Sequence, residues 1–217
     1  MEILNKLNIR TNNINLYKEA FTHTSYTNEN PEFPHYERLE FLGDAVLELI
    51  MSDYLYNSSD LEEGNMTKIR ASYVCENACA TYARDLGFDK YILLGSGEEG
   101  ANDTILADVF EAFIGALYLD KGFMYTNDLI LDIIVKYIED NVEFLQDYKS
   151  KLQELVQTVK QSVIYEIIDE QGPPHNKTFT CRVKVDDIVM GEGKGHSKKQ
   201  AEQEAAKVAL SKQAKKI

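Results

Sequence analysis

The hydrophobic pattern of this 217-residue chain changes its period once, near residue 147. Before that point apolar residues recur every three or four positions, and beyond it lies a segment in which they alternate strictly with polar residues. Spacing of three and four places apolar side chains on one face of a helix, whereas alternation places them on one face of a strand. The sequence therefore predicts two unlike domains, residues 1–146 and 147–217.

The first domain is predicted to be all-α. Helical spacing of apolar residues occurs in five segments: 14–24, 36–56, 66–86, 103–120 and 126–145. Stretches rich in Pro, Asn and Gly, which favour turns and loops, separate some of them at 27–35, 56–65 and 95–103.

The second domain is predicted to be a small α+β unit. It begins with the amphipathic stretch "YKSKLQELVQTVK", followed by the β-branched "SVIYEIIDE". In "TFTCRVKV" the apolar side chains alternate with polar ones, as in a half-buried strand. Asp186 and Asp187 form a predicted turn, "IVMGEG" a third strand, and "SKKQAEQEAAKVAL" a final helix. The predicted order is αβββα.

The net charge of −13 is an average over two different parts. Residues 1–146 contain 10 Lys and Arg against 26 Asp and Glu, whereas residues 147–217 contain 13 against 10. Electrostatic attraction to phosphate, which dominates nucleic-acid binding, must therefore come from the second domain and from local patches. The whole-chain charge does not exclude a nucleic-acid partner.

Acidic residues gather on two of the predicted helices. The helix at 36–56 carries four of them along one side, with no lysine among them: Glu37, Glu40, Asp44 and Glu48. Like charges four residues apart destabilise an isolated helix by about 0.2–0.5 kcal/mol per pair. Asp108 and Glu111 lie three residues apart on the helix at 103–120, which is apolar nearly all round and should be central. Burying ionised carboxylates there is costly unless they are paired or bind a metal.

Two interpretations of these acids remain open from spacing alone. If the two helices face each other, Glu40, Asp44, Asp108 and Glu111 form an all-oxygen ligand set of the kind that Mg²⁺ or Mn²⁺ prefers. Alternatively, the acids line a solvated groove or pair with Arg38, Arg70 or Arg84. Glu48 is predicted to be solvated.

Three cysteines, Cys75, Cys79 and Cys181, occur without a CxxC motif and predict reduced thiols in a cytoplasmic protein. Cys75 and Cys79, four apart on a predicted helix, could share a metal, but buried packing is favoured because no third Cys or nearby His completes a site. We expect no membrane association, since no run approaches the roughly 20 apolar residues needed to span a bilayer.

The stretch "ERLEFLGDA" (37–45) resembles the signature of ribonuclease III, a double-stranded-RNA endonuclease. Four further stretches agree with that family in order: "FTHTSY" (21–26), "EGNMTKIRA" (63–71), "LGSGEE" (94–99) and "ILADVFEAFIGALYLD" (105–120). The second domain resembles a double-stranded-RNA-binding domain, so the resemblance covers nearly the whole chain. One departure is a loop at 98–104 that is shorter than usual in the family, which leaves the carboxylates intact and bears on RNA contacts and dimer geometry there.

The resemblance implies that Glu40, Asp44, Asp108 and Glu111 are the catalytic metal ligands, with Glu37 and Glu63 as secondary acids. It further implies a Mg²⁺ cofactor, with Mn²⁺ as a possible substitute, and hydrolysis that leaves 5′-phosphate and 3′-hydroxyl ends. It also implies a homodimer, for which the apolar Phe41 is available as an anchor, and a role in RNA processing and maturation. Gly43 is expected to permit a close approach, and His23 to have a structural role.

The second domain carries candidate RNA contacts. Ser197 is a predicted N-cap, with Gln200 completing a capping box. Lys198 and Lys199 in the first turn oppose the helix dipole, which is understandable if phosphates occupy that end, and Lys194 should reach the same backbone. By resemblance, further contacts to two successive minor grooves come from Ser150, Gln153, Glu154, Gln157 and His175.

Other functional classes are an RNA-binding protein without catalysis, a structural subunit of a ribonucleoprotein, and a DNA nuclease. The first two predict at least one missing carboxylate, and all four are present. The last fits poorly with a domain that resembles a reader of A-form RNA. An αβββα adaptor with an ordinary solvated lysine cluster is the alternative for the second domain alone.

Overall fold

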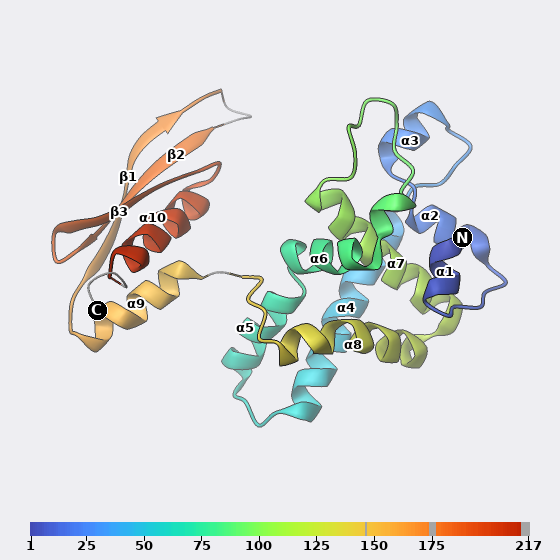
Figure 1. Cartoon of the computed structure of the whole chain (residues 1–217), viewed down its shortest axis with the longest axis horizontal. Helices are drawn as coiled ribbons and strands as arrows, with labels where there is room; N and C mark the ends of the chain where they lie inside the picture. Colours follow the sequence, from blue (N-terminus) through green and yellow to red (C-terminus); the bar gives the residue numbers. More distant parts are fainter. Residues whose placement is uncertain (146, 174–176, 214–217) are drawn as a thin grey trace. The chain divides into compact units, whose positions relative to one another are not determined.

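The computed structural model describes residues 1–145, 147–173 and 177–213, which belong to two compact units, Met1–Leu145 and Gln146–Ile217. The first unit is helical, and the second combines a three-stranded sheet with two helices (Figure 1). Each has its own hydrophobic core. The predicted fold class, an all-α domain followed by a small αβββα domain, is confirmed.

The described part of the first unit contains eight α-helices and one short 3₁₀ helix: α1 (Glu2–Lys6), α2 (Ile14–Ala20), α3 (Thr24–Glu29), α4 (Glu37–Ser58), α5 (Glu63–Tyr73), α6 (Glu76–Leu86), η1 (Phe88–Lys90), α7 (Asp103–Lys121) and α8 (Phe123–Glu139). The prediction of a single helix at 66–86 was wrong, because α5 and α6 occupy this range. Cys75 has extended backbone angles and begins α6, so the chain bends between two helices without a Gly or Pro to mark the place.

Helix α7 is the central helix of the first unit, and nearly all its side chains between Ile105 and Leu117 are buried. Figure 1 shows α4 and α7 within the helical unit. The two helices touch at two glycines, one on each helix. A Cβ added to Gly43 would lie 1.7 Å from the carbonyl oxygen of Glu111, and one added to Gly115 would lie 2.2 Å from that of Leu39. The two backbones are therefore in direct contact, and this crossing fixes which residues of the two helices face each other.

None of the helices in the described ranges combines the length and the hydropathy needed to cross a membrane.

The second unit has the order α9 (Tyr148–Thr158), β1 (Val163–Gln171), β2 (Thr178–Val185), β3 (Ile188–Gly195) and α10 (Lys198–Gln213). Its strands form an antiparallel sheet in the order β1-β2-β3. Cys181, Val183 and Val185 of β2 are buried against the helices, as the alternation predicted. Asp186 and Asp187 both have positive φ angles, of 46° and 66°, as a tight two-residue hairpin turn requires.

Helix α10 lies directly on strand β3 because both present small residues. Alternate positions of β3 are Gly191, Gly193 and Gly195, and a Cβ on Gly193 would lie 2.2 Å from the backbone nitrogen of Ala205. Ala201 and Ala205 are fully buried on the facing side of α10. Backbone-to-backbone contact therefore replaces large side chains in this part of the core.

Candidate metal centre and nucleic-acid interface

The crossing of α4 and α7 brings the four candidate ligands together. Glu40 and Asp44 lie one turn apart on α4 on either side of Gly43, and Gly43 touches the backbone of Glu111 on α7. Asp108 lies one turn before Glu111 on the same helix. The structure thus places two carboxylates from each helix around one contact between their backbones.

Glu40, Asp44, Asp108 and Glu111 form an acidic cluster, whose electrostatics oppose the ionisation of Glu40, Asp108 and Glu111. Burial, followed by the charges of Asp44, Glu40 and Asp108, raises the pKa of Glu111 to about 8. Burial, followed by the charge of Asp108, raises the pKa of Glu40 to about 7. Burial also raises the pKa of Asp108. Each of these carboxylates therefore lies where further negative charge is unfavourable.

Among the described residues, the basic influence on the acidic cluster comes from the charge of His23, which lowers the pKa of Asp108 against the effect of burial. Within the described residues, no Lys, Arg or His forms an ion pair with any of its four carboxylates. The arginines that offered an alternative lie elsewhere: Arg70 Nε is 3.7 Å from Glu48 Oε2, and Arg84 pairs with Asp103 at 2.5 Å. Glu48, predicted to be solvated, keeps 46% of its side-chain surface exposed and also pairs with Arg70 of α5.

Three residues outside the predicted ligand set adjoin the acidic cluster. The buried Tyr36 donates its phenolic hydrogen to Asp108 Oδ2 at 3.0 Å. The buried Cys79 thiol donates to the Val74 carbonyl oxygen at 3.7 Å, and its proximity lowers the pKa of Glu111 slightly against the larger effects that raise it. Glu76 accepts a hydrogen bond from Thr104 at 2.9 Å, and its charge contributes to the raised pKa of Asp108.

The donor set fits a hard divalent cation, because it consists of carboxylate oxygens whose mutual repulsion a cation would relieve. As the side chains lie, no three His, Cys, Asp or Glu residues in the described part of the chain form a ready-made metal-holding group. A cation held by Glu40, Asp44, Asp108 and Glu111 would therefore require some of these side chains to change rotamer. The sharing of a metal by Cys75 and Cys79 finds no support, since Cys79 is buried and Cys75 lies outside the helix.

The two secondary acids lie in different surroundings. Glu37 is exposed, 3.7 Å from His35 Nδ1, and its charge raises the pKa of Glu40. Glu63 instead accepts a hydrogen bond from Thr67 at 3.0 Å and lines a groove of about 460 Å³ between α4 and α5. Glu37 therefore belongs to the edge of the acidic cluster, and Glu63 to a neighbouring surface.

That neighbouring surface is apolar. Phe41, Leu49 and Tyr56 follow one another along α4 with 82%, 54% and 76% of their surface exposed. Leu49 and Tyr56 also line the groove with Met66 of α5. Large apolar side chains exposed in a row mark a surface that another molecule covers.

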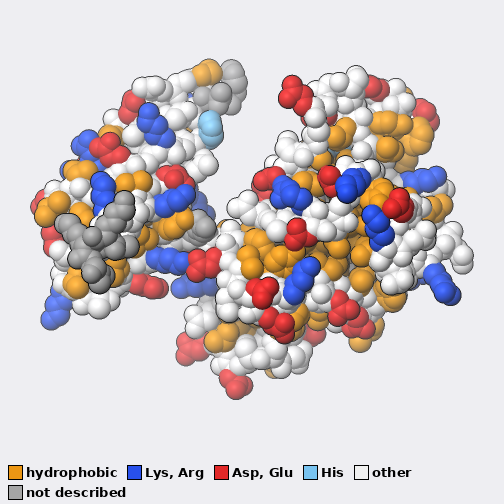
Figure 2. Space-filling model, viewed as in Figure 1, with side chains coloured by type: hydrophobic (Ala, Val, Ile, Leu, Met, Phe, Trp, Pro, Cys, Tyr) orange, Lys and Arg blue, Asp and Glu red, His pale blue; other side chains and the backbone are white. Residues whose placement is uncertain are grey.

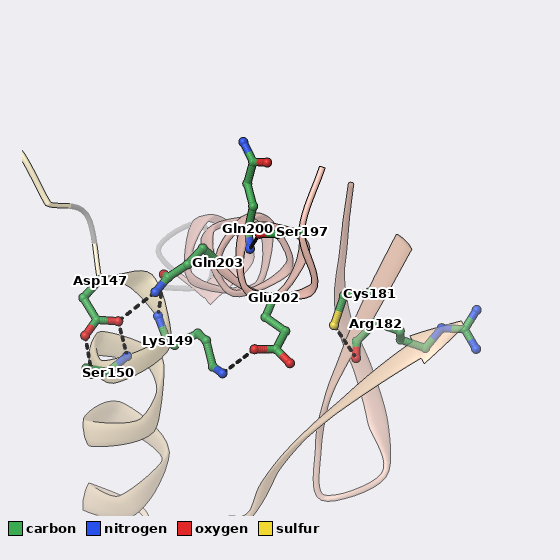
Figure 3. Close-up of polar contacts among 9 residues, drawn as sticks. All are labelled: Asp147, Lys149, Ser150, Cys181, Arg182, Ser197, Gln200, Glu202 and Gln203. Atoms are coloured by element: carbon green, nitrogen blue, oxygen red, sulfur yellow. Dashed lines mark hydrogen bonds and ion pairs between the residues drawn. The ribbon is translucent and has the colours of Figure 1, made fainter. Parts of the chain in front are cut away.

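In the second unit, polar contacts hold the start of α9 to α10 (Figure 3). Asp147 caps α9 by accepting from the backbone nitrogen of Ser150 at 3.1 Å, and also accepts from Gln203 of α10 at 3.0 Å. These hydrogen bonds from Gln203 and Ser150 lower the pKa of Asp147 to about 2. Lys149 pairs with Glu202 of α10 at 2.6 Å. The two helices thus present a fixed joint surface.

Three lysines near the start of α10 are exposed and, within the described residues, form no ion pair: Lys194, Lys198 and Lys199. Several other cations of this unit are paired, such as Arg182 with Glu192 at 2.7 Å and Lys184 with Glu166 at 2.8 Å. Basic and acidic side chains are accordingly interspersed on the face that Figure 2 shows. Uncompensated positive charge is concentrated where α10 begins.

The predicted capping box at the start of α10 forms with one difference. The Ser197 hydroxyl accepts from the backbone nitrogen of Gln200 at 3.1 Å, as predicted. The Gln200 side chain reaches back to the nitrogen of His196 rather than to that of Ser197, at 2.8 Å. The first turn is therefore fixed although its lysines oppose the helix dipole.

The RNA contacts suggested for α9 are mostly accessible. Glu154 and Gln157 are exposed and Gln153 is half-buried. The hydroxyl of Ser150 donates to Asp147 Oδ2 at 2.5 Å, so this side chain already has a partner within the unit. His175 lies outside the described residues.

Comparison with known families agrees with both units. Residues 13–138 match the family described as ribonuclease-III-like, and residues 148–213 match the double-stranded RNA binding motif. The chain belongs to the ribonuclease III family. The resemblance noted in the sequence is thereby confirmed.

Relatives in the ribonuclease III family are similar over most of their length. Ribonuclease 3 of Onion yellows phytoplasma is 46% identical over 213 residues, covering 96% of this chain and 89% of that protein. Ribonuclease 3 of Oceanobacillus iheyensis is 50% identical over 204 residues, covering 90% of each. The solved nuclease domain of ribonuclease III from Campylobacter jejuni superimposes with a TM-score of 0.58 at 35% identity, covering 62% of this chain and 95% of that domain.

Proposed function

We propose that this chain is a Mg²⁺-dependent endonuclease that hydrolyses phosphodiester bonds of double-stranded RNA, with Mn²⁺ able to replace Mg²⁺. The products are 5′-phosphate and 3′-hydroxyl ends. The observation that carries the proposal is the acidic cluster at the α4–α7 crossing, whose four carboxylates lie together without a basic partner among the described residues. Membership of the ribonuclease III family and the double-stranded RNA binding motif supply the substrate class.

Glu40, Asp44, Asp108 and Glu111 are the proposed ligands and catalytic residues. When bound, Mg²⁺ lowers the pKa of a water molecule that attacks the phosphorus and stabilises charge on the leaving 3′ oxygen. The chain contributes the positions of these ligands. Because Gly43 lies against the backbone of Glu111, the two helices that carry the carboxylates form one rigid frame, as precise placement of catalytic groups requires.

The second unit is proposed to hold the RNA by shape. Lys194, Lys198 and Lys199 contact phosphates at the start of α10, where no internal ion pair competes for them among the described residues. The exposed side of α9, with Gln153, Glu154 and Gln157, and the Ser150 position beside it, contacts one minor groove, and His175 the next. Ser197 fixes the first turn of α10 that presents the two adjacent lysines.

The active form is proposed to be a homodimer paired through the apolar face of α4, formed by Phe41, Leu49 and Tyr56. The solved Campylobacter jejuni domain is described as containing a region involved in dimer formation. Each of the two sites would cut one strand and leave a short 3′ overhang. Phe41→Ser should shift the molar mass measured by light scattering toward the monomer, and an unchanged dimer would contradict this pairing.

The cellular role proposed is processing of ribosomal and messenger RNA precursors in the cytoplasm, where the three free thiols, Cys75, Cys79 and Cys181, stay reduced.

Cleavage of an end-labelled RNA duplex of about 30 base pairs tests the activity. Wild type, Asp108→Asn and Asp120→Asn are compared in MgCl₂ and in CaCl₂. Asp120 is a matched control because it lies on α7 and, like Asp108, accepts a hydrogen bond from a tyrosine. We expect wild type and Asp120→Asn to cut in Mg²⁺, and Asp108→Asn to bind the duplex without cutting. Binding without cutting by wild type, in Mg²⁺ and Mn²⁺ alike, would overturn the proposal.

A further inference from the structure

Tyr36 connects the two halves of the acidic cluster. Its carbonyl oxygen accepts hydrogen bonds from the backbone nitrogens of Leu39, at 2.8 Å, and Glu40, at 3.0 Å, and so forms the first turn of α4. Its phenolic hydroxyl donates to Asp108 Oδ2 of α7 at 3.0 Å. Only 3% of its surface is exposed. One buried residue therefore starts the helix that carries Glu40 and holds the carboxylate of the other helix.

The ring of Tyr36 is itself held in place. The Tyr36 backbone nitrogen donates to Thr22 at 3.0 Å, and the His23 ring lies 5.7 Å from the Tyr36 ring, centroid to centroid. His23 Nδ1 is 2.7 Å from Ser25 Oγ, which in turn accepts from the backbone nitrogen of Gly95 at 2.9 Å. Two segments far apart in the sequence thus fix the position of the phenol that meets Asp108.

We propose that Tyr36 is a positioning residue for the metal site: its hydroxyl holds Asp108 Oδ2, fixes the rotation of that carboxylate and leaves Oδ1 for the cation. This inference rests on the proposed function. Hydrogen bonds from neighbouring residues to a metal-ligating carboxylate orient it, and their loss typically weakens metal affinity or activity about 10- to 100-fold.

The same chain offers a matched control. Tyr17 of α2 donates to Asp120 Oδ2 at 2.9 Å and is also fully buried. Asp120 lies on α7 about three turns beyond Asp108, which is roughly 18 Å along the helix axis. Tyr17→Phe and Tyr36→Phe therefore remove the same kind of hydrogen bond from the same helix, and only Tyr36→Phe removes it at the acidic cluster.

The experiment uses the full chain and three readouts: affinity for MnCl₂ by calorimetry, affinity for an RNA duplex in CaCl₂, and the cleavage rate at saturating RNA. We expect Tyr36→Phe to bind Mn²⁺ about 10- to 100-fold more weakly and to cut more slowly at low Mg²⁺. RNA affinity in Ca²⁺ should be unchanged, and Tyr17→Phe should match wild type throughout. Tyr36→Met, which fills the space without a hydroxyl, replaces Tyr36→Phe if the latter does not fold.

The outcomes separate this inference from the nuclease assignment. If wild type cuts, Asp108→Asn does not, and Tyr36→Phe binds Mn²⁺ as wild type does, the positioning role is overturned and the nuclease assignment stands. Equal weakening by Tyr17→Phe and Tyr36→Phe also overturns it, because the effect would then be general to α7. Failure of wild type to bind Mn²⁺ and to cut would overturn both.

Discussion

At the scale of single residues, Glu111 is the carboxylate of the acidic cluster with the strongest opposition to ionisation. Burial comes first among the causes, and the charges of Asp44, Glu40 and Asp108 follow, which together raise its pKa to about 8. An unfolded glutamate has a pKa near 4.3. Between these values the folded state holds a proton that the unfolded state has released, so stability must fall as pH rises from about 4.3 through about 8.

Glu111→Gln removes this pH dependence. In EDTA, the variant should gain stability relative to wild type as pH rises from 5 to 8.5, by about 1.4 kcal/mol for each pH unit between the two pKa values. Added Mg²⁺ should raise the melting temperature of wild type more than that of the variant. Thermal unfolding measured across this pH range checks the prediction, with the exposed Glu99→Gln as control. A difference between Glu111→Gln and wild type that does not change with pH would contradict it.

The four carboxylates were predicted as one site from their residue type and the family motif, whereas their spacing alone left a second interpretation open. The residues that support them were not predicted in that role. Tyr36 meets Asp108 across 72 positions of sequence, and nothing in the spacing of a tyrosine indicates which distant carboxylate its hydroxyl will reach. Cys79 and Glu76 likewise approach the site only because α6 packs beside α7. Supporting contacts of this kind depend on tertiary packing, which one sequence does not display.

At the scale of elements, the α4–α7 crossing depends on Gly43. A Cβ there would lie 1.7 Å from the Glu111 carbonyl oxygen, so Gly43→Ala must push the helices apart. Gly64 in α5 has nothing within 4 Å of the corresponding position. Gly43→Ala should cost about 1–3 kcal/mol or more and reduce cleavage about 100-fold, whereas Gly64→Ala should be neutral or stabilising by up to about 1 kcal/mol.

Denaturant unfolding measures the stability of Gly43→Ala and Gly64→Ala, and cleavage rates measure their activity. The comparison is matched because both substitutions add one methyl group to a helical glycine of the same unit. Cleavage by Gly43→Ala at the wild-type rate would show that the ligand positions do not depend on the crossing.

The second unit has a comparable close contact, in which a glycine of strand β3 meets the backbone of helix α10. Gly193→Ala would place a Cβ 2.2 Å from the Ala205 backbone nitrogen and should destabilise this unit by about 1–3 kcal/mol. Amide hydrogen exchange in the full chain should show faster exchange in α10 and unchanged exchange in α7. Gly97→Ala, which meets nothing within 4 Å, is the control. Protection of α10 at the wild-type level would contradict the prediction.

Helix and strand type followed from periodicity, whereas boundaries and packing did not. The helix predicted at 66–86 divides at Cys75, where the backbone becomes extended without a residue that signals a turn. The glycines of β3 occupy every second position, and these are the positions that contact α10. Because glycine is also common in turns, this spacing alone does not predict a helix packed against the strand. The alternating glycines were visible in the sequence, but only the structure shows that α10 packs against them.

At the scale of the whole molecule, the chain divides its charge between its two units. The first 146 residues are strongly acidic, whereas the region from residue 147 has a small basic excess. An acidic body repels RNA except where a cation intervenes, so affinity for RNA must come mainly from the second unit. This division predicts that binding and cutting respond to different substitutions.

Substitution of Lys198 and Lys199 tests whether RNA binding and RNA cutting depend on different units. If both contact phosphates, Lys198→Ala with Lys199→Ala should weaken RNA binding and reduce the slope of log affinity against log salt concentration by about 1 for each lysine. The rate of cutting at saturating RNA should stay unchanged, because the acidic cluster belongs to the other unit.

Lys207→Ala is the control, since Lys207 lies on the same helix but pairs with Glu204 at 3.7 Å. Titrations of a duplex at several salt concentrations give both slopes. An unchanged slope in the double variant would mean that these lysines do not displace counterions, and the phosphate contacts would then have to lie elsewhere on the unit.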